Sequence, residues 1–442
     1  MVKVSSWGRL KFNEHVCIPM ISAKKMPDLI IHLGDNDSAC NGQSNYLPRG
    51  NGRSYGDVCT NENGILLSSL YLDNFIEFNP KESWIKVQAG VILKDLQRFL
   101  VKCGFMLPVT PGTQMITVGG AIANDVHCKN HHRYGTFGNH VKSLKLLRSS
   151  GEIMNCSPSE NAGFFRATIG GIGLTGMITE ATLSLKKVNG PWIDAENIPY
   201  GDLKEFFELA ESSENDYEHT VSWIDCITGN GERGVFMRGN NSDEAGYSEI
   251  NRNIKVPFVM PFSLVNKLSL YSFNKLYYFV QSIKKNPFKV HYEKFFYPLD
   301  NILEWNRIYG PKGFFQYQCV IPPEYGIDAI TEMQKEIAKS GTGSFLGVLK
   351  TFGDYKSVGL LSFPYKGFTY ALDFPNLGKT TERLFERLDS IVLNAHGRLY
   401  LAKDARQPKK LFEAGYGDFM GEFCKYRDPN CSSDISRRLM GF

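Results

Sequence analysis

The stretch that decides the fold is PVTPGTQMITVGGAIANDVHCKNHHRYGTFGNH, residues 108–140. Its first half is rich in Pro and Gly, and the small residues at 117–124 can open a helix whose bare backbone N–H groups meet an anion. Its second half places four histidines, with Lys129 and Arg133, within residues 127–140. We predict a phosphate cradle followed by proton-active side chains, because packing alone does not account for so many polar groups beside a glycine turn.

The composition indicates a globular protein of more than one domain. With 442 residues, 42% of them hydrophobic, the chain can bury large cores, and its length favours two or three domains. The formal net charge is only +4, from 50 Lys and Arg against 46 Asp and Glu, so no global field recruits nucleic acid. An anionic partner must therefore be met by a local site.

Cysteine usage and hydropathy indicate the compartment. The ten cysteines form no CxxC pair, which fits free thiols in a reducing compartment better than disulfides or a zinc site. Residues 1–20 mix charged with apolar positions, so no signal peptide is expected. The longest uncharged apolar run near the middle, residues 256–266, has about half the length of a membrane span. We therefore expect a cytoplasmic protein without a transmembrane segment.

Another glycine-rich segment precedes this stretch. We expect residues 28–51 to begin strand-like and to end in the loop PRGNGRSYGD, residues 48–57. Three glycines, a serine and two arginines suit a tight loop that wraps a diphosphate with backbone amides and guanidinium groups. An ordinary surface turn explains the same composition, and the loop alone does not decide between the two.

The first half of the chain has an α+β pattern. A helix is predicted at residues 91–103 from its apolar period, and strands at 64–70, 84–89, 141–148, 152–156 and 177–185. Residues 164–178 contain a GxGxxG pattern, but a strand follows where a Rossmann site requires a helix. We therefore predict a further glycine loop against a cofactor rather than a Rossmann domain.

The amino-acid composition changes at residues 188–191, VNGP, where Gly and Pro predict a domain boundary. Beyond it, residues 256–296 interleave aromatic and aliphatic side chains with lysines. Such a segment suits a surface that touches a membrane interface or an isoprenoid. A domain core with a solvated lysine face is the commoner reason for this pattern, and we expect it here.

Two further strands carry candidate ligand-binding side chains. Residues 313–321 and 344–350 alternate polar and apolar positions, so Gln316, Gln318 and Lys350 can share one face with a ligand. A solvent-facing sheet edge accounts for the same alternation.

A candidate base lies nearer the C-terminus. A helix is predicted at residues 381–395, and GRLYLAKDAR follows at 397–406. Lys403 stands in this strand-to-loop transition between Tyr400 and Asp404. Because burial lowers the pKa of a lysine, a partly desolvated Lys403 is a candidate general base.

Several of these blocks together carry a family resemblance. The chain contains, in this order, RGNGRSYGD, TVGGAIANDVHCKNHH, GGIGLTG, EWNRIYGPKGFFQYQ and GRLYLAKDAR. Over nearly its full length it resembles the flavoprotein oxidase subunit of decaprenylphosphoryl-ribose 2′-epimerase, one of the vanillyl-alcohol-oxidase (VAO/PCMH-type) flavoenzymes. The resemblance implies an α+β fold, with a two-subdomain FAD-binding domain at residues 1–190 and 399–442. It implies an α+β substrate domain with an antiparallel sheet at residues 191–398.

The resemblance also implies the site residues. It places the FAD diphosphate against Arg49, Gly50, Asn51, Gly52, Arg53, Ser54, Tyr55 and Gly56. It places the isoalloxazine and ribityl parts along Gly112, Thr117, Gly119, Gly120, Asn124 and His127, with Ile178 and Tyr400 closing on the cofactor. Around the substrate it places Tyr55, His127, Lys129, Trp223, Gln316, Gln318, Lys350 and Lys403, with Ala371 at a pocket position.

The implied reaction transfers a hydride from C2′ of a polyprenyl-phosphoryl ribofuranose to FAD and gives a 2′-keto sugar. A separate NAD(P)H-dependent short-chain reductase would then form the arabinose epimer for the cell envelope, with the protein peripheral to the inner membrane. The chemistry needs a base near the 2′-hydroxyl. We expect Lys403 to be that base, with Tyr55 and His127 orienting the hydroxyl, and His127 is the alternative base. Lys350 and Lys129 would meet sugar oxygens or the lipid phosphate.

Departures from the family pattern shape further expectations. Related enzymes often attach FAD through a histidine in the first glycine loop, but residues 50–57 contain none, so we expect non-covalent FAD. Cys128 is expected to fill space rather than form a cysteinyl link. No metal is expected, because the clustered histidines lack carboxylates at ligand spacing apart from Asp125. Ala371 stands where mycobacterial members carry a cysteine beside the flavin, so the protein should escape inhibitors that bond to that thiol.

Two other functions fit parts of the pattern. An aldonolactone or sugar-alcohol oxidase of the same fold would act on a soluble substrate with O2, and an ordered, polar-capped core at residues 256–296 would favour it. A mobile apolar flap over the flavin would favour the lipid-linked sugar. A non-catalytic flavin-binding protein would keep the glycine loops but lack a base, whereas Lys403, His127 and Tyr55 are all present.

Overall fold

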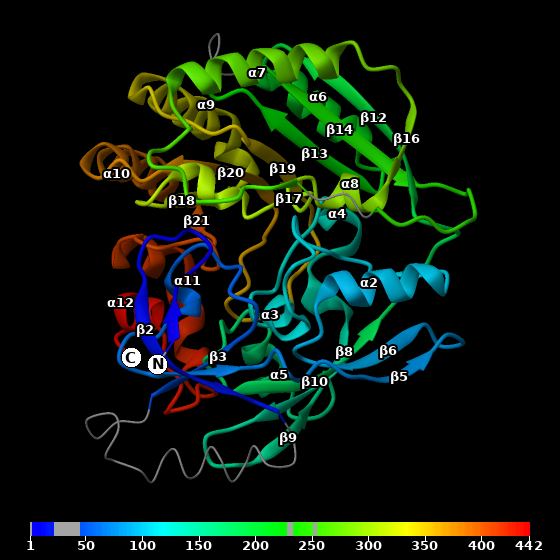
Figure 1. Ribbon diagram of the computed structural model, residues 1–442, viewed down its shortest axis with the longest axis vertical. Helices are drawn as coiled ribbons and strands as arrows, with labels where there is room; N and C mark the ends of the chain where they lie inside the picture. Colours follow the sequence, from blue (N-terminus) through cyan, green and yellow to red (C-terminus); the bar gives the residue numbers. More distant parts are fainter. Residues whose placement is uncertain (1, 22–44, 228–232, 251–253) are drawn as a thin grey trace.

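The computed structural model describes residues 2–21, 45–227, 233–250 and 254–442. The strand-like segment predicted from residue 28 therefore lies outside the described residues as far as residue 44. Figure 1 shows a lower half, built around two smaller sheets, and an upper half, built around one large sheet with helices at its outer side.

The lower half contains a four-stranded sheet in the order β1-β2-β4-β3. Its strands are β1 (Val2–Val4), β2 (Asn13–Pro19), β4 (Ile65–Ser68) and β3 (Tyr46–Arg49). β4 runs parallel to both β2 and β3. Because β3 ends at Arg49, the first glycine loop starts where the chain leaves the edge of this sheet.

A five-stranded antiparallel sheet completes the lower half, in the order β5-β6-β10-β8-β9. Its strands are β5 (Phe75–Asn79), β6 (Trp84–Gln88), β10 (Met177–Ser184), β8 (Val141–Leu147) and β9 (Ile153–Cys156). Shorter elements beside it are β7 (Phe105–Met106), β11 (Lys186–Lys187), α4 (His131–Tyr134) and α5 (Ala162–Thr168).

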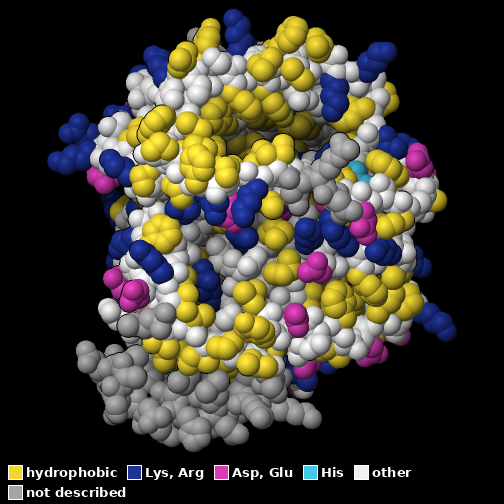
Figure 2. All heavy atoms as spheres, viewed as in Figure 1, with side chains coloured by type: hydrophobic (Ala, Val, Ile, Leu, Met, Phe, Trp, Pro, Cys, Tyr) yellow, Lys and Arg dark blue, Asp and Glu magenta, His cyan; other side chains and the backbone are white. Residues whose placement is uncertain are grey.

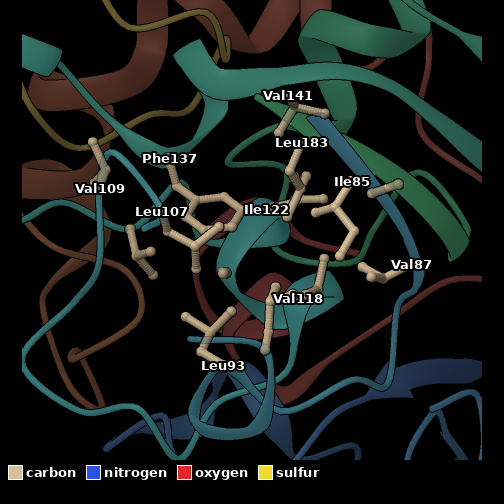
Figure 3. Close-up of a cluster of buried hydrophobic side chains, with 14 of the residues drawn as sticks. Ile85, Val87, Leu93, Leu107, Val109, Val118, Ile122, Phe137, Val141 and Leu183 are labelled. Atoms are coloured by element: carbon tan, nitrogen blue, oxygen red, sulfur yellow. The ribbon is translucent and has the colours of Figure 1, made fainter. Parts of the chain in front are cut away.

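Two helices pack on one face of this sheet. They are α2 (Leu93–Lys102) and α3 (Val118–Ala123). Figure 3 shows Val118 and Ile122 of α3 lying against Ile85 and Leu183 of the sheet, in a cluster of buried side chains. Alternate burial along β6 and the helical apolar period of α2 build this core, which holds α3 firmly in place.

The upper half contains an eight-stranded antiparallel sheet in the order β16-β12-β14-β13-β19-β20-β18-β21. The strands are β16 (Phe288–His291), β12 (Trp192–Tyr200), β14 (Gly234–Asn241), β13 (His219–Ile224), β19 (Val348–Phe352), β20 (Gly367–Pro375), β18 (Phe314–Ile321) and β21 (Arg398–Leu399). Its helices are α6 (Leu203–Ser213), α7 (Lys267–Ser282), α8 (Tyr292–Phe296), α9 (Pro323–Ser340) and α10 (Lys379–Asn394). A short parallel pair, β15 (Ile254–Lys255) and β17 (Ile302–Leu303), lies apart from it.

One face of the large sheet packs against helices, and the other lines a cavity. Cys319 and Tyr370 share a buried core with α6, α9 and α10. Their neighbours Gln318 and Ala371 point to the opposite face, because successive side chains of a strand alternate, and they line a cavity. The predicted alternation in residues 313–321 therefore places polar side chains towards the interior of the molecule, not at a solvent-facing edge.

The chain returns to the lower half after β21. Residues 401–442 carry α11 (Lys409–Phe423) and α12 (Asp434–Met440), and Leu401 and Tyr416 pack with Tyr46 of β3. The lower half is thus built from both ends of the chain.

The predicted elements form, with two corrections. Residues 344–347 are not a strand, since the Trp223 indole N–H donates to the carbonyl of Phe345, 2.9 Å away, and β19 begins only at Val348. The core expected at residues 256–296 is wrong for α7, which buries only Leu270 and Asn274, whereas α8 at the end of the segment does contribute Tyr292, Phe295 and Phe296 to the core. Among the described residues, no helix has the length and apolar character needed to span a bilayer.

Candidate active site

A cavity of about 760 Å³ lies between the glycine loops of the lower half and the inner face of the large sheet. It brings together the residues assigned above to cofactor, substrate and catalysis, with Gly56 as the exception. A Cβ on Gly56 would stand 1.6 Å from the carbonyl oxygen of Asp404, so this glycine serves the close packing of the first loop against the segment that carries Lys403.

The first glycine loop and the start of α3 are in contact. A Cβ on Gly50 would stand 2.3 Å from Oγ1 of Thr117, and Gly52 has a φ of +61° that favours glycine. Thr117 caps α3, since its hydroxyl accepts a hydrogen bond of 3.1 Å from the backbone N–H of Gly120. The two segments predicted as anion cradles therefore form one continuous wall.

This wall fits the FAD that the family resemblance implies. Nε of Arg53 and Oδ1 of Asn124 are buried without a hydrogen-bond partner among the described residues, and both side chains line the cavity. The Arg53 guanidinium is held 4.2 Å from the ring centre of Trp7. An orphaned donor on Arg53 and an orphaned acceptor on Asn124, beside two glycine-rich segments in contact, suit an elongated cofactor that carries both phosphate oxygens and hydroxyl groups.

The further glycine loop also reaches the cavity. Gly173 and Gly176 line it, with φ of +80° and +129° respectively. β10 begins directly afterwards, at Met177, so the GxGxxG pattern here precedes a strand as predicted.

Lys403 lines the cavity beside Tyr55. Its Nζ stands 3.8 Å from the ring centre of Tyr55. Desolvation lowers the pKa of Lys403 to about 7, partly opposed by the negative charge of Asp373. Desolvation also raises the pKa of Asp373 to about 7, and this carboxylate accepts a hydrogen bond of 2.6 Å from the amide of Gln316. A lysine in this setting can release and accept a proton near neutral pH.

Both ring nitrogens of His127 face a hydrogen-bond donor. Nε2 stands 3.1 Å from the amide nitrogen of Gln318, and Nδ1 stands 3.3 Å from Nζ of Lys350. Burial and the neighbouring lysine hold the pKa of His127 well below its usual value, so the ring is neutral at pH 7. A neutral imidazole accepts a hydrogen bond at only one nitrogen, so His127 accepts from either Gln318 or Lys350, and a ring held in this way is suited to orienting a ligand.

Two further lysines make the cavity positively charged. Desolvation lowers the pKa of Lys129 and that of Lys350 to about 8, so both remain mostly protonated at pH 7. Lys129 donates a hydrogen bond to the carbonyl of Phe295. Two ammonium groups beside a partly neutral Lys403 favour an anionic ligand such as a sugar phosphate.

Of the four clustered histidines, only His127 lines the cavity. The rings of His132 and His140 contact the backbone carbonyls of Tyr217 and Tyr134, at 2.9 Å and 2.8 Å. His131 is buried against the ring of Phe352. In the described ranges, no group of three or more His, Cys, Asp or Glu side chains is placed to hold a metal ion.

The sequence reasoning missed two acidic residues of the cavity region. Asp373 lies on the same strand face as Ala371, two residues away, so the period of β20 was a usable signal for it. Asp300 accepts hydrogen bonds of 2.7 Å from the hydroxyl of Thr113 and from the backbone N–H of Gln114. It joins residues 186 positions apart, and no local pattern announces such a contact.

Comparison with known proteins is consistent with this geometry. A family model for an FAD-binding domain matches residues 38–157. Decaprenylphosphoryl-β-D-ribose oxidase of Mycolicibacterium smegmatis is 33% identical over 456 aligned residues, which cover 99% of this chain and 97% of that protein. L-gulonolactone oxidase of Mus musculus is 30% identical over 30% of each chain. D-2-hydroxyglutarate dehydrogenase of Escherichia coli is 31% identical over 29% of this chain and 13% of its own.

Proposed function

Because the chain belongs to the family of decaprenylphosphoryl-β-D-ribose oxidase, we propose that it oxidises the 2′-hydroxyl of a polyprenyl-phosphoryl-β-D-ribofuranose to a 2′-keto sugar. It is an FAD-dependent oxidoreductase of the vanillyl-alcohol-oxidase type. One observation carries the proposal: a single cavity extends from the glycine loops past Lys403 to the underside of α7. The glycine loops leave room for a flavin. Lys403 supplies a proton acceptor, and Lys129 and Lys350 supply two ammonium groups. Apolar side chains of α7 can contact the first part of a lipid.

Proton removal is the task of Lys403 in this proposal. Desolvation lowers the pKa of Lys403 to about 7, which favours the neutral amine, and a neutral amine can accept the proton of the 2′-hydroxyl. FAD, when bound, supplies the acceptor for the hydride that leaves C2′. Tyr55 and His127 orient the sugar, since the Tyr55 ring lies beside Nζ of Lys403 and His127 is fixed by Gln318. Lys129 and Lys350 bind the phosphate or the sugar oxygens.

The FAD is held without a covalent bond. The first glycine loop and residues 117–124 bind the diphosphate and the adjoining parts of the cofactor through backbone N–H groups and Arg53. Burial raises the pKa of Cys128, so the thiol stays protonated and unreactive. We assign FAD binding to residues 1–190 and 399–442, and substrate binding to residues 191–398.

The 2′-keto product requires a reductase to complete an epimerisation to the arabinose form. A separate NAD(P)H-dependent short-chain reductase is the partner we propose, and the cytoplasmic face of the inner membrane is the site. Of the two other functions considered, a lactone oxidase is supported by similarity over only 30% of the chain. A non-catalytic role does not account for a buried lysine in the cavity whose pKa is lowered by desolvation.

The test is an anaerobic flavin titration. The purified holoprotein is mixed with a polyprenyl-phosphoryl ribofuranose, and the absorbance of oxidised flavin is followed. Rapid bleaching that free ribose and aldonolactones do not produce supports the proposal. Bleaching by a lactone or polyol, with none by the lipid-linked sugar, overturns it.

A further inference from the structure

Helix α7 presents an apolar face to solvent. Leu268, Leu276 and Phe279 are 76%, 62% and 59% exposed, and Ile283, just past the end of the helix, is 65% exposed. At 3.6 residues per turn these four side chains project from one side of the helix, opposite the buried Leu270. A surface helix of a water-exposed domain has the reverse arrangement, with its polar face outwards.

The apolar surface continues into the segment that precedes α7. Ile254, Phe258 and Phe262 are 74%, 60% and 66% exposed. Figure 2 shows hydrophobic side chains gathered over the upper part of the molecule around a hollow, with lysine and arginine side chains towards its outer edge. We call residues 254–283 the apolar rim. A contiguous exposed patch of this kind marks an interaction surface.

The segment itself carries charge of one sign, although Lys289 is ion-paired with Glu244 from outside it. No Asp or Glu occurs from residue 254 to residue 292, which contain six lysines: Lys255, Lys267, Lys275, Lys284, Lys285 and Lys289. Lys267 and Lys275 belong to α7 itself and are exposed. Lysines beside a row of Leu and Phe complement a bilayer surface that carries anionic phospholipid.

The inner side of the same helix closes the cavity. Phe273, Tyr277 and Gln281 of α7 line it, and the Tyr277 ring stands 4.8 Å from that of Trp223 on β13. One helix therefore separates the apolar end of the cavity from the surface described above.

We propose that the apolar rim docks on a bilayer that contains anionic phospholipid, with α7 lying in the plane of the interface. The inference rests on the proposed function, because it explains how a substrate with a polyprenyl chain reaches the cavity. The sugar phosphate enters beneath α7 while the distal part of the chain stays among the acyl chains. The substrate then never exposes its whole apolar chain to water.

A second copy of this chain fits the rim less well than a membrane does. Pairing two rims would bring two sets of lysines together with no carboxylate from residues 254–292 to neutralise them. An anionic bilayer supplies the missing negative charge.

The test measures binding of the full-length holoprotein to vesicles by co-sedimentation. Vesicles of phosphatidylcholine with phosphatidylglycerol are compared with vesicles of phosphatidylcholine alone. The double variant Leu276→Glu/Phe279→Glu should lose binding by about a hundredfold. Each large apolar side chain that leaves water contributes roughly tenfold, and this variant removes two of them. Lys267→Gln and Lys275→Gln should each lose about fivefold on the anionic vesicles only.

The matched control is Ile153→Glu, at a 44% exposed position on β9, at the far end of the molecule from α7 (Figure 1). It should bind vesicles as the wild type does. Equal binding by Leu276→Glu/Phe279→Glu and by the wild type, or a wild-type protein that binds neither vesicle, overturns the proposal. A shift from dimer to monomer in sedimentation velocity, with unchanged vesicle binding, would assign the rim to a second copy instead.

Flavin bleaching by a water-soluble, short-chain phosphoryl ribofuranose separates the two proposals. The rim variants should keep wild-type bleaching, because these side chains do not line the cavity. If the wild type binds vesicles but no phosphoryl ribofuranose bleaches its flavin, the proposed function fails and the docking surface stands. If the sugar bleaches the flavin but the wild type binds no vesicles, the proposed function stands and the docking surface fails.

Discussion

The negative charge of Asp373 should determine the pH of the acid limb in the pH–rate profile of the enzyme. Asp373→Asn keeps an oxygen that can accept the hydrogen bond from Gln316 and removes the carboxylate that raises the pKa of Lys403. Without that carboxylate the pKa of Lys403 falls below its present value of about 7. Only the neutral amine accepts the proton, so the acid limb of the pH–rate profile moves to lower pH.

The expected shift is about one pH unit. An opposite charge close by typically moves a pKa by about 1–3 units, and the lower value applies because Asp373, with a pKa of about 7, is only partly ionised where Lys403 titrates. One unit corresponds to about 1.4 kcal/mol and to about tenfold more neutral lysine on the acid limb.

Single-turnover flavin reduction by the ribofuranose substrate, measured from about pH 5 to 9, reads out this shift. Asp389→Asn is the matched control, because Asp389 is a buried aspartate with a pKa raised to about 6 that does not line the cavity. It should leave the acid limb in place. An unmoved limb in Asp373→Asn, or a limb that moves to higher pH, would refute Lys403 as the base.

Three further changes test the site. Lys403→Met should slow flavin reduction by about 10²–10⁴-fold while the bound flavin spectrum stays unchanged, and wild-type rates would exclude this lysine from catalysis. Gly50→Ala should lower the flavin-to-protein ratio after gel filtration, because its Cβ would stand 2.3 Å from Oγ1 of Thr117, and full flavin content would show that the loop has room. Asp300→Ala should lower the melting temperature of the holoprotein by roughly 2–4 °C, since two hydrogen bonds to residues 113 and 114 are lost, and an unchanged value would mean that this link is dispensable.

Local chemistry made the glycine loops and the strand faces predictable. Gly52 and Gly173 adopt a positive φ, which glycine tolerates better than other residues, so clustered glycines are a local signal for such loops. The alternation that joins Gln316 and Gln318 follows from the period of a strand, and both line the cavity. The assignment of individual roles to these residues stays a prediction.

Other features depend on partners that the chain alone does not reveal. The apolar pattern of α7 is the same for a buried helix and for one that faces a lipid, so its periodicity could not locate its outer face. Asp300 acquires its role only through a contact with Gln114, 186 positions earlier. Residues 344–347 have a strand-like pattern, but the Trp223 indole uses the carbonyl of Phe345.

The return of the C-terminal segment to the lower half fixes the order in which a ribosome can finish this protein. Tyr46 and Leu67 emerge early, yet their core also contains Phe412, Tyr416 and Leu439. The hydrophobic core beside the first glycine loop therefore stays incomplete until Leu439 has been synthesised. A nascent chain that stalls before residue 400 would therefore carry the first glycine loop without the C-terminal side chains that complete the core beside it.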